Sequence, residues 1–270
     1  MSSTVSLTLL GTGSSGGVPR LGNDWGACDP TEPRNRRRRC SALIERFDDR
    51  APEARTRLLI DTSPDLREQL LDAQISRLDG VVYSHDHADQ SHGIDDVRPL
   101  VIRQRKAIPV WMDAPTRQTL VSKFKYCFAG DKGYPPILDL QPELIPGTPF
   151  EVAGPGGVLA LLPLLQQHGR IVSLGFRIGG LAYCNDVSDL PPQTRQALTG
   201  LEVLIVDALR YTPHPSHAHL DQALEWIAEL KPKRAILTNL HVDLDYATLC
   251  TTLPEGVEPA YDGLRVNLTD

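Results

Sequence analysis

Residues 80–93 read GVVYSHDHADQSHG, an apolar stretch that ends in a dense set of histidine and aspartate side chains. Residues two apart share one face at the end of a strand, so His85 and His87 can point at one centre. Asp89 follows where the chain turns into a loop. Neutral imidazoles and carboxylates are ligands of zinc and similar divalent ions, and catalytic sites leave a position for water. The stretch therefore predicts a metal site rather than a polar loop with surface histidines.

Two later positions bring further metal-type side chains to the ends of strands. His168 follows the segment LLQQ (164–167), and Asp186 follows the segment LAYCN (181–185). Taken alone, each residue is most simply explained as part of a loop. Beside the cluster at His85, both become candidates for ligands at the same rim.

Further motifs stand in a fixed order along the chain: LGTGSSGGVP (10–19), LIDT (59–62), YCND (183–186) and RAILTNLH (234–241). With the cluster at His85 and with His168, they give a sequence that resembles the metallo-β-lactamase-fold hydrolases. The resemblance is to the branch that contains the tRNA 3′-processing endonuclease and the phosphoribosyl cyclic phosphate phosphodiesterase. It implies an α+β fold, a four-layer αββα sandwich, which we expect to form one domain over residues 1–270. The metal site would lie on the rim where the loops of the two sheets meet.

The resemblance also implies roles for individual residues. His85, His87 and His168 would hold the first metal, Asp186 would bridge, and Asp89 would belong to the second metal. The reaction implied is hydrolysis by a metal-bound hydroxide, with a phosphodiester as the substrate of this branch. Asp89 or Asp186 would orient the attacking group.

Two positions depart from the family pattern. The last histidine of the family pattern H-x-H-x-D-H is replaced here by Gln90. The late histidine that follows ILT in the family is replaced by Asn239. Amide oxygens are poorer zinc ligands than imidazole and suit harder ions such as manganese. Three interpretations stay open: one zinc with a weak or empty second site, a second site for zinc or manganese, or a chain that has lost fast turnover. We rank compensation by His92 or His241 below these, because a shift of two residues moves a side chain far.

The loop RYTPHPSHAHL (210–220) supplies a candidate general acid. Aligned on Leu220, the catalytic histidine of the family falls on His217, and His219 is the runner-up. A histidine that titrates near neutrality can protonate a leaving oxygen or steady a phosphoryl oxygen. His219, His241, Gln90 and Asn239 are also candidates for contacts to the second metal or to the substrate.

The charge balance limits the kinds of partner. With 28 basic and 34 acidic residues the formal charge is -6, which argues against a nucleic-acid coat or a membrane-surface protein. The basic run RNRRRR (34–39) attracts phosphate or forms a solvated loop, and we favour the loop because no aromatic residues accompany it. No leader or membrane-spanning run is evident, so we expect a cytoplasmic protein. We keep a homodimer open.

Hydrophobic patterns predict many short strands and a few helices. The expected strands are 5–10, 41–47, 57–61, 80–84, 158–165, 171–178, 181–185, 202–207, 234–238 and 264–268. A helix is expected to begin at Ser63 as N-cap, with Leu66, Leu70 and Leu71 on its apolar face. Further helices are expected over 115–126, 192–198 and 220–230, and residues 130–149 are expected to form a long loop.

These observations favour a metal-dependent hydrolase that acts on a small phosphodiester, such as a cyclic phosphate or a nucleotide. One alternative is a hydrolase of carboxylic esters, thioesters or lactones, which the polar loop at His217 disfavours because an acyl pocket should be more apolar. Another is a nucleotide- or metal-binding protein with little turnover, for which Gln90 and Asn239 are the evidence.

Overall fold

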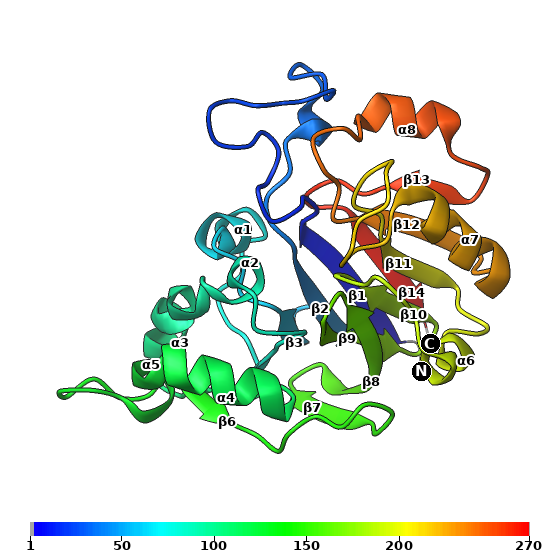
Figure 1. Ribbon diagram of the computed structural model, residues 1–270. Helices are drawn as coiled ribbons and strands as arrows, with labels where there is room; N and C mark the ends of the chain where they lie inside the picture. The colour runs from blue at the N-terminus through cyan, green and yellow to red at the C-terminus, as the bar shows by residue number, and fades with distance from the viewer. Residues whose placement is uncertain (1–2, 270) are drawn as a thin grey trace. The chain divides into compact units, whose positions relative to one another are not determined.

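The computed structural model describes residues 3–269, which form two seven-stranded sheets with helices (Figure 1). The chain divides into two compact units: the first takes in residues up to Leu10, 41–160 and from 265 onward, and the second takes in 11–40 and 161–264. Both units are built from segments distant in the sequence. The single domain expected over residues 1–270 stays a prediction.

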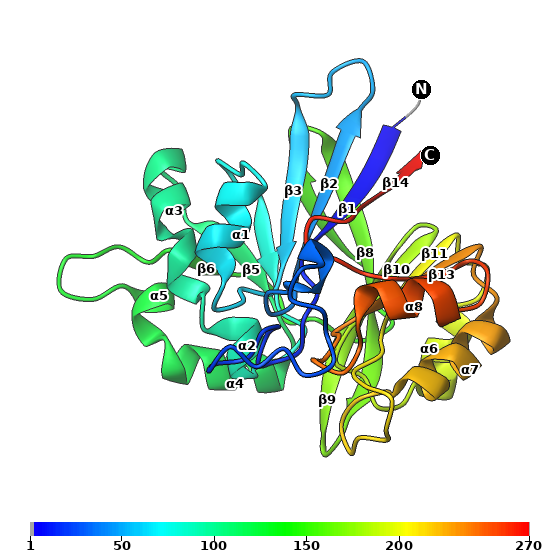
Figure 2. The ribbon, with the colours of Figure 1, turned by 90° about the horizontal axis from the view of Figure 1, so that it is seen from above.

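The first sheet is mixed and has the strand order β14-β1-β2-β3-β4-β5-β6 (Figure 2). β1 pairs antiparallel with β14, and β2 pairs antiparallel with β3, whereas β3 to β6 run parallel. Its strands are β1 (Ser3–Gly11), β2 (Ser41–Asp48), β3 (Arg55–Ile60), β4 (Gly80–Val82), β5 (Ile108–Trp111), β6 (Leu138–Leu140) and β14 (Arg265–Thr269). The helices of this region are α1 (Leu66–Asp72), α2 (Ala88–Ser91), α3 (Arg98–Gln104), α4 (Ala114–Lys123) and α5 (Lys125–Ala129).

The second sheet has the order β13-β12-β11-β10-β9-β8-β7, and β10 to β13 run parallel. Its strands are β7 (Phe150–Gly154), β8 (Gly157–His168), β9 (Ile171–Ile178), β10 (Leu181–Cys184), β11 (Val203–Asp207), β12 (Arg234–Thr238) and β13 (Val257–Pro259). The helices that follow its strands are α6 (Pro192–Ala197), α7 (Leu220–Leu230) and α8 (Tyr246–Thr252). Because the carboxyl ends of parallel strands meet at one edge, residues that follow β10, β11 and β12 are brought together.

Helix α7 illustrates how the sequence builds these layers. Its apolar residues recur every three or four positions, and Ala223, Trp226 and Leu230 are buried in one cluster with Leu204 and Val206 of β11. A fully buried side chain of this size contributes about 2–3 kcal/mol of hydrophobic stabilisation. In the first unit a second cluster joins side chains of α1 to those of β4 and β5.

The predicted strands and helices are present, with three corrections. Helix α1 begins at Leu66 rather than directly after Ser63, because the Ser63 hydroxyl accepts from the Asp65 amide (3.0 Å) and closes a turn before the helix. Leu71, expected on the apolar face of this helix, is 55% exposed. The helix expected over 115–126 is two helices, α4 and α5, which break at Phe124.

The shorter elements were not expected from the sequence: β5, β6, β7, β13, α2, α3 and α8. Residues 130–149 form a loop, as predicted, apart from the short strand β6. None of the helices within residues 3–269 is both long enough and apolar enough to cross a bilayer.

Candidate metal centre

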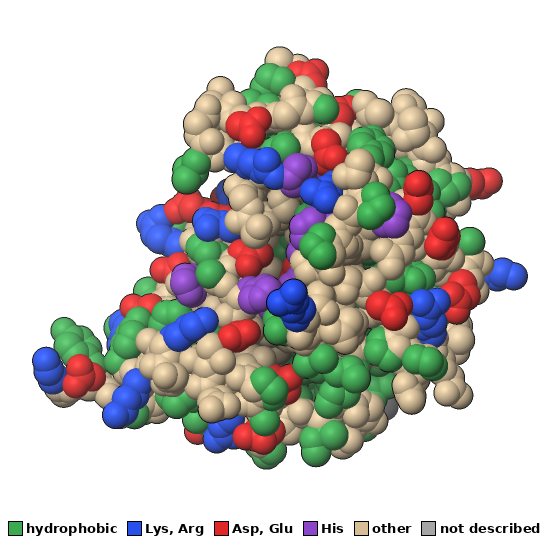
Figure 3. Space-filling view, viewed as in Figure 1, with side chains coloured by type: hydrophobic (Ala, Val, Ile, Leu, Met, Phe, Trp, Pro, Cys, Tyr) green, Lys and Arg blue, Asp and Glu red, His purple; other side chains and the backbone are tan. Residues whose placement is uncertain are grey.

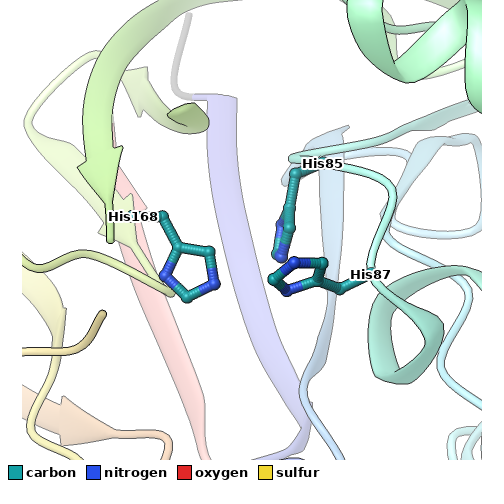
Figure 4. A group of neighbouring side chains, drawn as sticks. All are labelled: His85, His87 and His168. Carbon is teal, nitrogen blue, oxygen red and sulfur yellow. The ribbon is translucent and has the colours of Figure 1, made fainter. Parts of the chain in front are cut away.

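The predicted histidine cluster lies directly after β4, a buried three-residue strand. The chain leaves this strand through Tyr83 and Ser84, and His87 is the N-cap of the short helix α2. The rings of His85 and His87 meet edge to face, with their centroids 4.5 Å apart (Figure 4). His85 is buried and His87 is exposed, so the pair presents one anchored and one accessible imidazole.

The anchoring of His85 comes from the end of the neighbouring strand. The Ser84 hydroxyl donates to the Asp61 carboxylate (2.7 Å) and lies 3.0 Å from His85 Nδ1. Because the hydroxyl proton is directed at Asp61, the serine oxygen accepts from Nδ1–H, which leaves the lone pair of His85 on Nε2. Burial raises the pKa of Asp61 to about 7, although hydrogen bonds from Ser84 oppose the shift. Sequence reasoning missed Asp61 and Ser84 as supports of this imidazole.

Asp89 and Gln90 occupy the first turn of α2. Asp89 is half-buried and Gln90 is fully buried, and the Gln90 side-chain amide donates to Asp89 Oδ2 over 3.2 Å. The backbone of Gln90 also accepts from the Thr62 amide at 2.8 Å. The amide nitrogen of Gln90, which has no lone pair to offer, therefore faces the carboxylate.

The second unit brings together three of the predicted residues, His168, Asp186 and His217. Each offers one ligand atom, and these atoms lie within 4.8 Å of one another. His168 is the last residue of β8 (Figure 4), and Asp186 follows β10 in a left-handed conformation with φ of 53°. The His168 Nδ1 lies 2.6 Å from the Ser216 carbonyl, to which it can only donate. The lone pair of this imidazole is therefore also on Nε2.

His217 is held by Asp207, a buried carboxylate that sequence reasoning missed. Asp207 Oδ2 lies 2.8 Å from His217 Nδ1 and also accepts from the Val187 amide at 3.1 Å. Asp186 Oδ1 lies farther from the same nitrogen, at 3.5 Å. The signal that could have identified Asp207 is its place as the last residue of β11, beside the strand that leads to Asp186.

Asn239 follows β12 and has a left-handed backbone with φ of 63°. Its amide nitrogen lies 3.3 Å from Asp186 Oδ1 and 3.2 Å from Asp207 Oδ1. Its carbonyl oxygen lies 3.8 Å from the Cys40 thiol. The nitrogen also lies 3.1 Å from His217 Nδ1, and its N–H groups are the only part of the amide that can donate to the two carboxylates. The Cys40 thiol lies closer to the Gly13 carbonyl, at 3.3 Å.

The remaining predicted histidines lie outside the ligand groups that the described residues form. His219 is the N-cap of α7, without a side-chain capping bond. His241 Nδ1 lies 2.8 Å from Asp243, and its Nε2 contacts the Arg20 guanidinium. His92 packs edge to face on Phe124, with ring centroids 5.6 Å apart.

Two arginines of the basic run at residues 34–39 pack against other parts of the second unit. Arg37 is buried and reaches the Cys28 thiol, the Asn35 side chain and the His241 carbonyl. Arg34 lies over the rings of Tyr246 and Tyr261, at 5.0 and 5.3 Å from their centroids. These contacts favour the interpretation of the run as a structured loop.

The donor set is that of a divalent metal site. His85 and His168 each have Nδ1 engaged by an oxygen, the arrangement that orients imidazoles for a metal at Nε2. Asp186 adds a carboxylate to the group with His168. Histidine side chains also reach the surface on the face drawn in Figure 3, among acidic and basic ones.

Comparisons with known proteins agree with this description. The family model described as the beta-lactamase superfamily domain matches residues 56–239. A curated octanoyltransferase of Porphyromonas gingivalis is 34% identical over 262 residues, which are 95% of this chain but only 50% of that protein. This chain thus spans about half the length of that relative.

Solved structures match over nearly the whole chain. The crystal structure described as a new diphosphatase from the PhnP family is 33% identical, covers 100% of this chain and 99% of its own, and has a TM-score of 0.87. The short form of human tRNase Z is 15% identical, covers 97% of this chain and 98% of its own, and has a TM-score of 0.63. These similarities confirm the resemblance and the predicted fold, the metallo-β-lactamase fold with two mixed sheets flanked by helices.

Proposed function

This chain belongs to the beta-lactamase superfamily, and we propose that it is a metal-dependent phosphodiesterase. The substrate proposed is a small phosphodiester, a cyclic phosphate or a nucleotide. The observation that carries the proposal is the group of His168, Asp186 and His217, with His217 held by the buried Asp207. Metal-dependent hydrolysis of a P–O bond uses ligands that hold the metal and an acid that protonates the leaving oxygen. These residues would supply both.

We assign the metal ligands as the sequence predicts them. His85, His87 and His168 would hold the metal through imidazole nitrogens, and Asp186 would add a carboxylate. When bound, a zinc ion or similar cation supplies Lewis acidity, which acidifies water and polarises a phosphoryl oxygen. Ser84 and the Ser216 carbonyl keep the Nε2 lone pairs of His85 and His168 available for this role.

His217 is assigned as the general acid. Its Nδ1–H is directed at Asp207, so the proton it can deliver is the one at Nε2. In the proposed reaction, water adds to phosphorus, the P–O bond to the leaving alkoxide breaks, and the His217 imidazolium protonates that alkoxide. The proton lost by the attacking water passes to solvent, from which His217 is protonated again. Asp207 contributes by fixing the ring and by stabilising its positive charge, without touching the substrate.

Diphosphate hydrolysis is a second candidate, favoured by one comparison. The structure with 33% identity and complete coverage is described as a diphosphatase. The octanoyltransferase name belongs to a protein twice as long as the matched region, so we propose no acyl transfer from it.

A substrate panel tests the proposal. The metal-loaded protein is assayed with bis(4-nitrophenyl) phosphate, a cyclic nucleotide, a nucleoside diphosphate, a 4-nitrophenyl ester and a lactone, each with and without EDTA. We expect hydrolysis of the phosphodiesters, its loss on chelation and its return with added zinc or manganese. Turnover confined to the carboxylic ester or the lactone would contradict the proposal, and binding of nucleotide without turnover would favour the low-turnover alternative.

A further inference from the structure

The side-chain amides of Gln90 and Asn239 each donate hydrogen bonds to carboxylates. In the first unit Gln90 donates its amide to Asp89. In the second unit Asn239 donates its amide toward both Asp186 and Asp207. These are the two positions at which the sequence departs from the histidine pattern of the family, so the contacts bear on whether a second metal ion fits.

The Asn239 amide lies beside two buried carboxylates, those of Asp186 and Asp207. Asp186 and Asp207 are both buried, and two carboxylates near one another repel in a low-dielectric environment. Binuclear sites relieve such repulsion with a second ion. Here the N–H edge of one neutral amide lies within 3.3 Å of an oxygen of each carboxylate.

Other N–H donors complete the set around these two acids. The Asn185 amide donates to the second oxygen of Asp186 at 2.7 Å, and the Val187 backbone amide donates to Asp207 at 3.1 Å. Hydrogen bonds to the charged form of a carboxylate stabilise that form. These N–H donors therefore compensate the negative charge of Asp186 and Asp207 by hydrogen bonding.

The orientation of Asn239 is set by its surroundings. The adjoining backbone is fixed, since Leu240 bonds through its amide to the Thr12 carbonyl at 2.8 Å. Turning the amide over would direct its oxygen at two carboxylates and remove both hydrogen bonds. Asn239 therefore cannot offer its oxygen as a metal ligand without losing these contacts.

We propose that these hydrogen bonds, from Gln90 to Asp89 and from Asn239 to Asp186 and Asp207, replace the charge compensation of a second metal ion, so that the protein works with one metal ion per chain. The inference deepens the proposed function and rests on it for the first ion. Asn239 is then a positioning residue, which holds Asp186 and Asp207 and, through Asp207, His217.

Metal stoichiometry tests this inference apart from activity. The apo-protein is titrated with zinc, and bound metal is measured by mass spectrometry after gel filtration. We expect about one ion per chain in the wild type and a second ion in the paired variant Gln90→His with Asn239→His, because two imidazoles replace two amides. Gln118→His, which adds an imidazole to an exposed part of α4, is the matched control and should stay at one.

A spectroscopic measurement on the wild type does not depend on the folding of any variant. Protein loaded with excess Mn²⁺ and then desalted should give the six-line electron paramagnetic resonance spectrum of an isolated ion. An exchange-coupled spectrum, or two zinc ions bound in the wild type, would overturn the inference while leaving the proposed function intact. If the paired variant also fails to bind a second ion, the amides of Gln90 and Asn239 are not what excludes it. No metal in the wild type would contradict both proposals.

Discussion

His217 has its ring orientation fixed from one side, and this decides which of its nitrogens can do chemistry. Asp207 engages Nδ1 at 2.8 Å, and Asp207 is itself buried and held by the Val187 amide. Because the ring is already oriented, His217 needs no rotation of its side chain before it transfers a proton. As the general acid, His217 would deliver its proton from Nε2, and as a ligand it would bind the metal through the same nitrogen.

Replacement of His217 by Ala distinguishes these two uses. If His217 is the general acid, turnover of a poorly activated phosphodiester should fall roughly 100- to 10,000-fold while metal content is unchanged. An activated ester such as bis(4-nitrophenyl) phosphate should lose less, since its leaving group needs little protonation. His219→Ala is the control and should retain turnover. If turnover of both substrates falls equally, or if metal content falls, His217 is a metal ligand or a binding residue and not the general acid.

The residues of the site differ in how far the sequence reveals them. His85 and His87 could be predicted because both stand in one short segment directly after an apolar strand, where alternation places them on the same face. Asp207 and Asp61 give a weaker signal, because a single acid at a strand end is common and its partners come from other elements. The amide contacts of Gln90 and Asn239 depend on tertiary geometry in the same way.

At the scale of elements, a turn before β14 ties distant loops of the second unit together. Asp262 accepts from the backbone and hydroxyl of Thr12, at 3.0 and 2.8 Å, and from the Arg38 amide at 2.8 Å. Burial raises the pKa of Asp262 to about 7, although these hydrogen bonds oppose the shift. The folded protein therefore holds a proton on this group that the unfolded chain releases near pH 3.8.

This raised pKa predicts a pH dependence of stability. Below about pH 4 both states are protonated, and between pH 4 and 7 only the folded state binds the proton, so the free energy of unfolding falls as pH rises. The loss attributable to Asp262 is on the order of a few kcal/mol. Chemical denaturation of the wild type and Asp262→Asn at equal metal saturation should show a steeper fall in the wild type. Parallel curves would contradict the assignment.

The loop that carries His85 and His87 is attached to the segment after β3 by a close backbone approach. Gly93 donates to the Thr62 carbonyl at 2.9 Å, and a Cβ at Gly93 would lie 2.0 Å from the Ser63 carbonyl oxygen. Gly93→Ala should therefore destabilise the protein by about 1–3 kcal/mol and weaken metal binding. Gly16→Ala, whose nearest neighbour is the flexible Arg20 side chain at 3.3 Å, is the control. Equal melting temperatures for the two variants would contradict this prediction.

Elements with long periodic patterns could be predicted from the sequence, and short ones could not. Helix α7 matches its expected range because eleven residues give several periods of burial. Strand β9 matches its range because a largely apolar run of eight residues is bounded by glycine-containing turns at both ends. Strands such as β5 and β13, of four and three residues, contain too few positions for alternation to show. Helix α2, of four residues, is a single turn closed by backbone bonds from the Gln90 amide to the His87 carbonyl and from the His92 amide to the Ala88 carbonyl, and so short an element shows no periodicity.

At the scale of the whole molecule, the proposed ligands are divided between the two compact units. His85 and His87 belong to the first, and His168 and Asp186 belong to the second. An ion that binds the folded chain and not the unfolded one stabilises the folded state by mass action. The family pattern, which spans residues 56–239, covers ligands of both units.

The most direct test of the account is the metal content of two single variants, one in each unit. We expect about one ion per chain in the wild type and near none in either His85→Ala or His168→Ala, because the same ion would lose an imidazole in both cases. His92→Ala, an exposed histidine that packs on Phe124, should keep the wild-type content. Full metal retained in either His85→Ala or His168→Ala would contradict the proposed ligand set of His85, His87, His168 and Asp186.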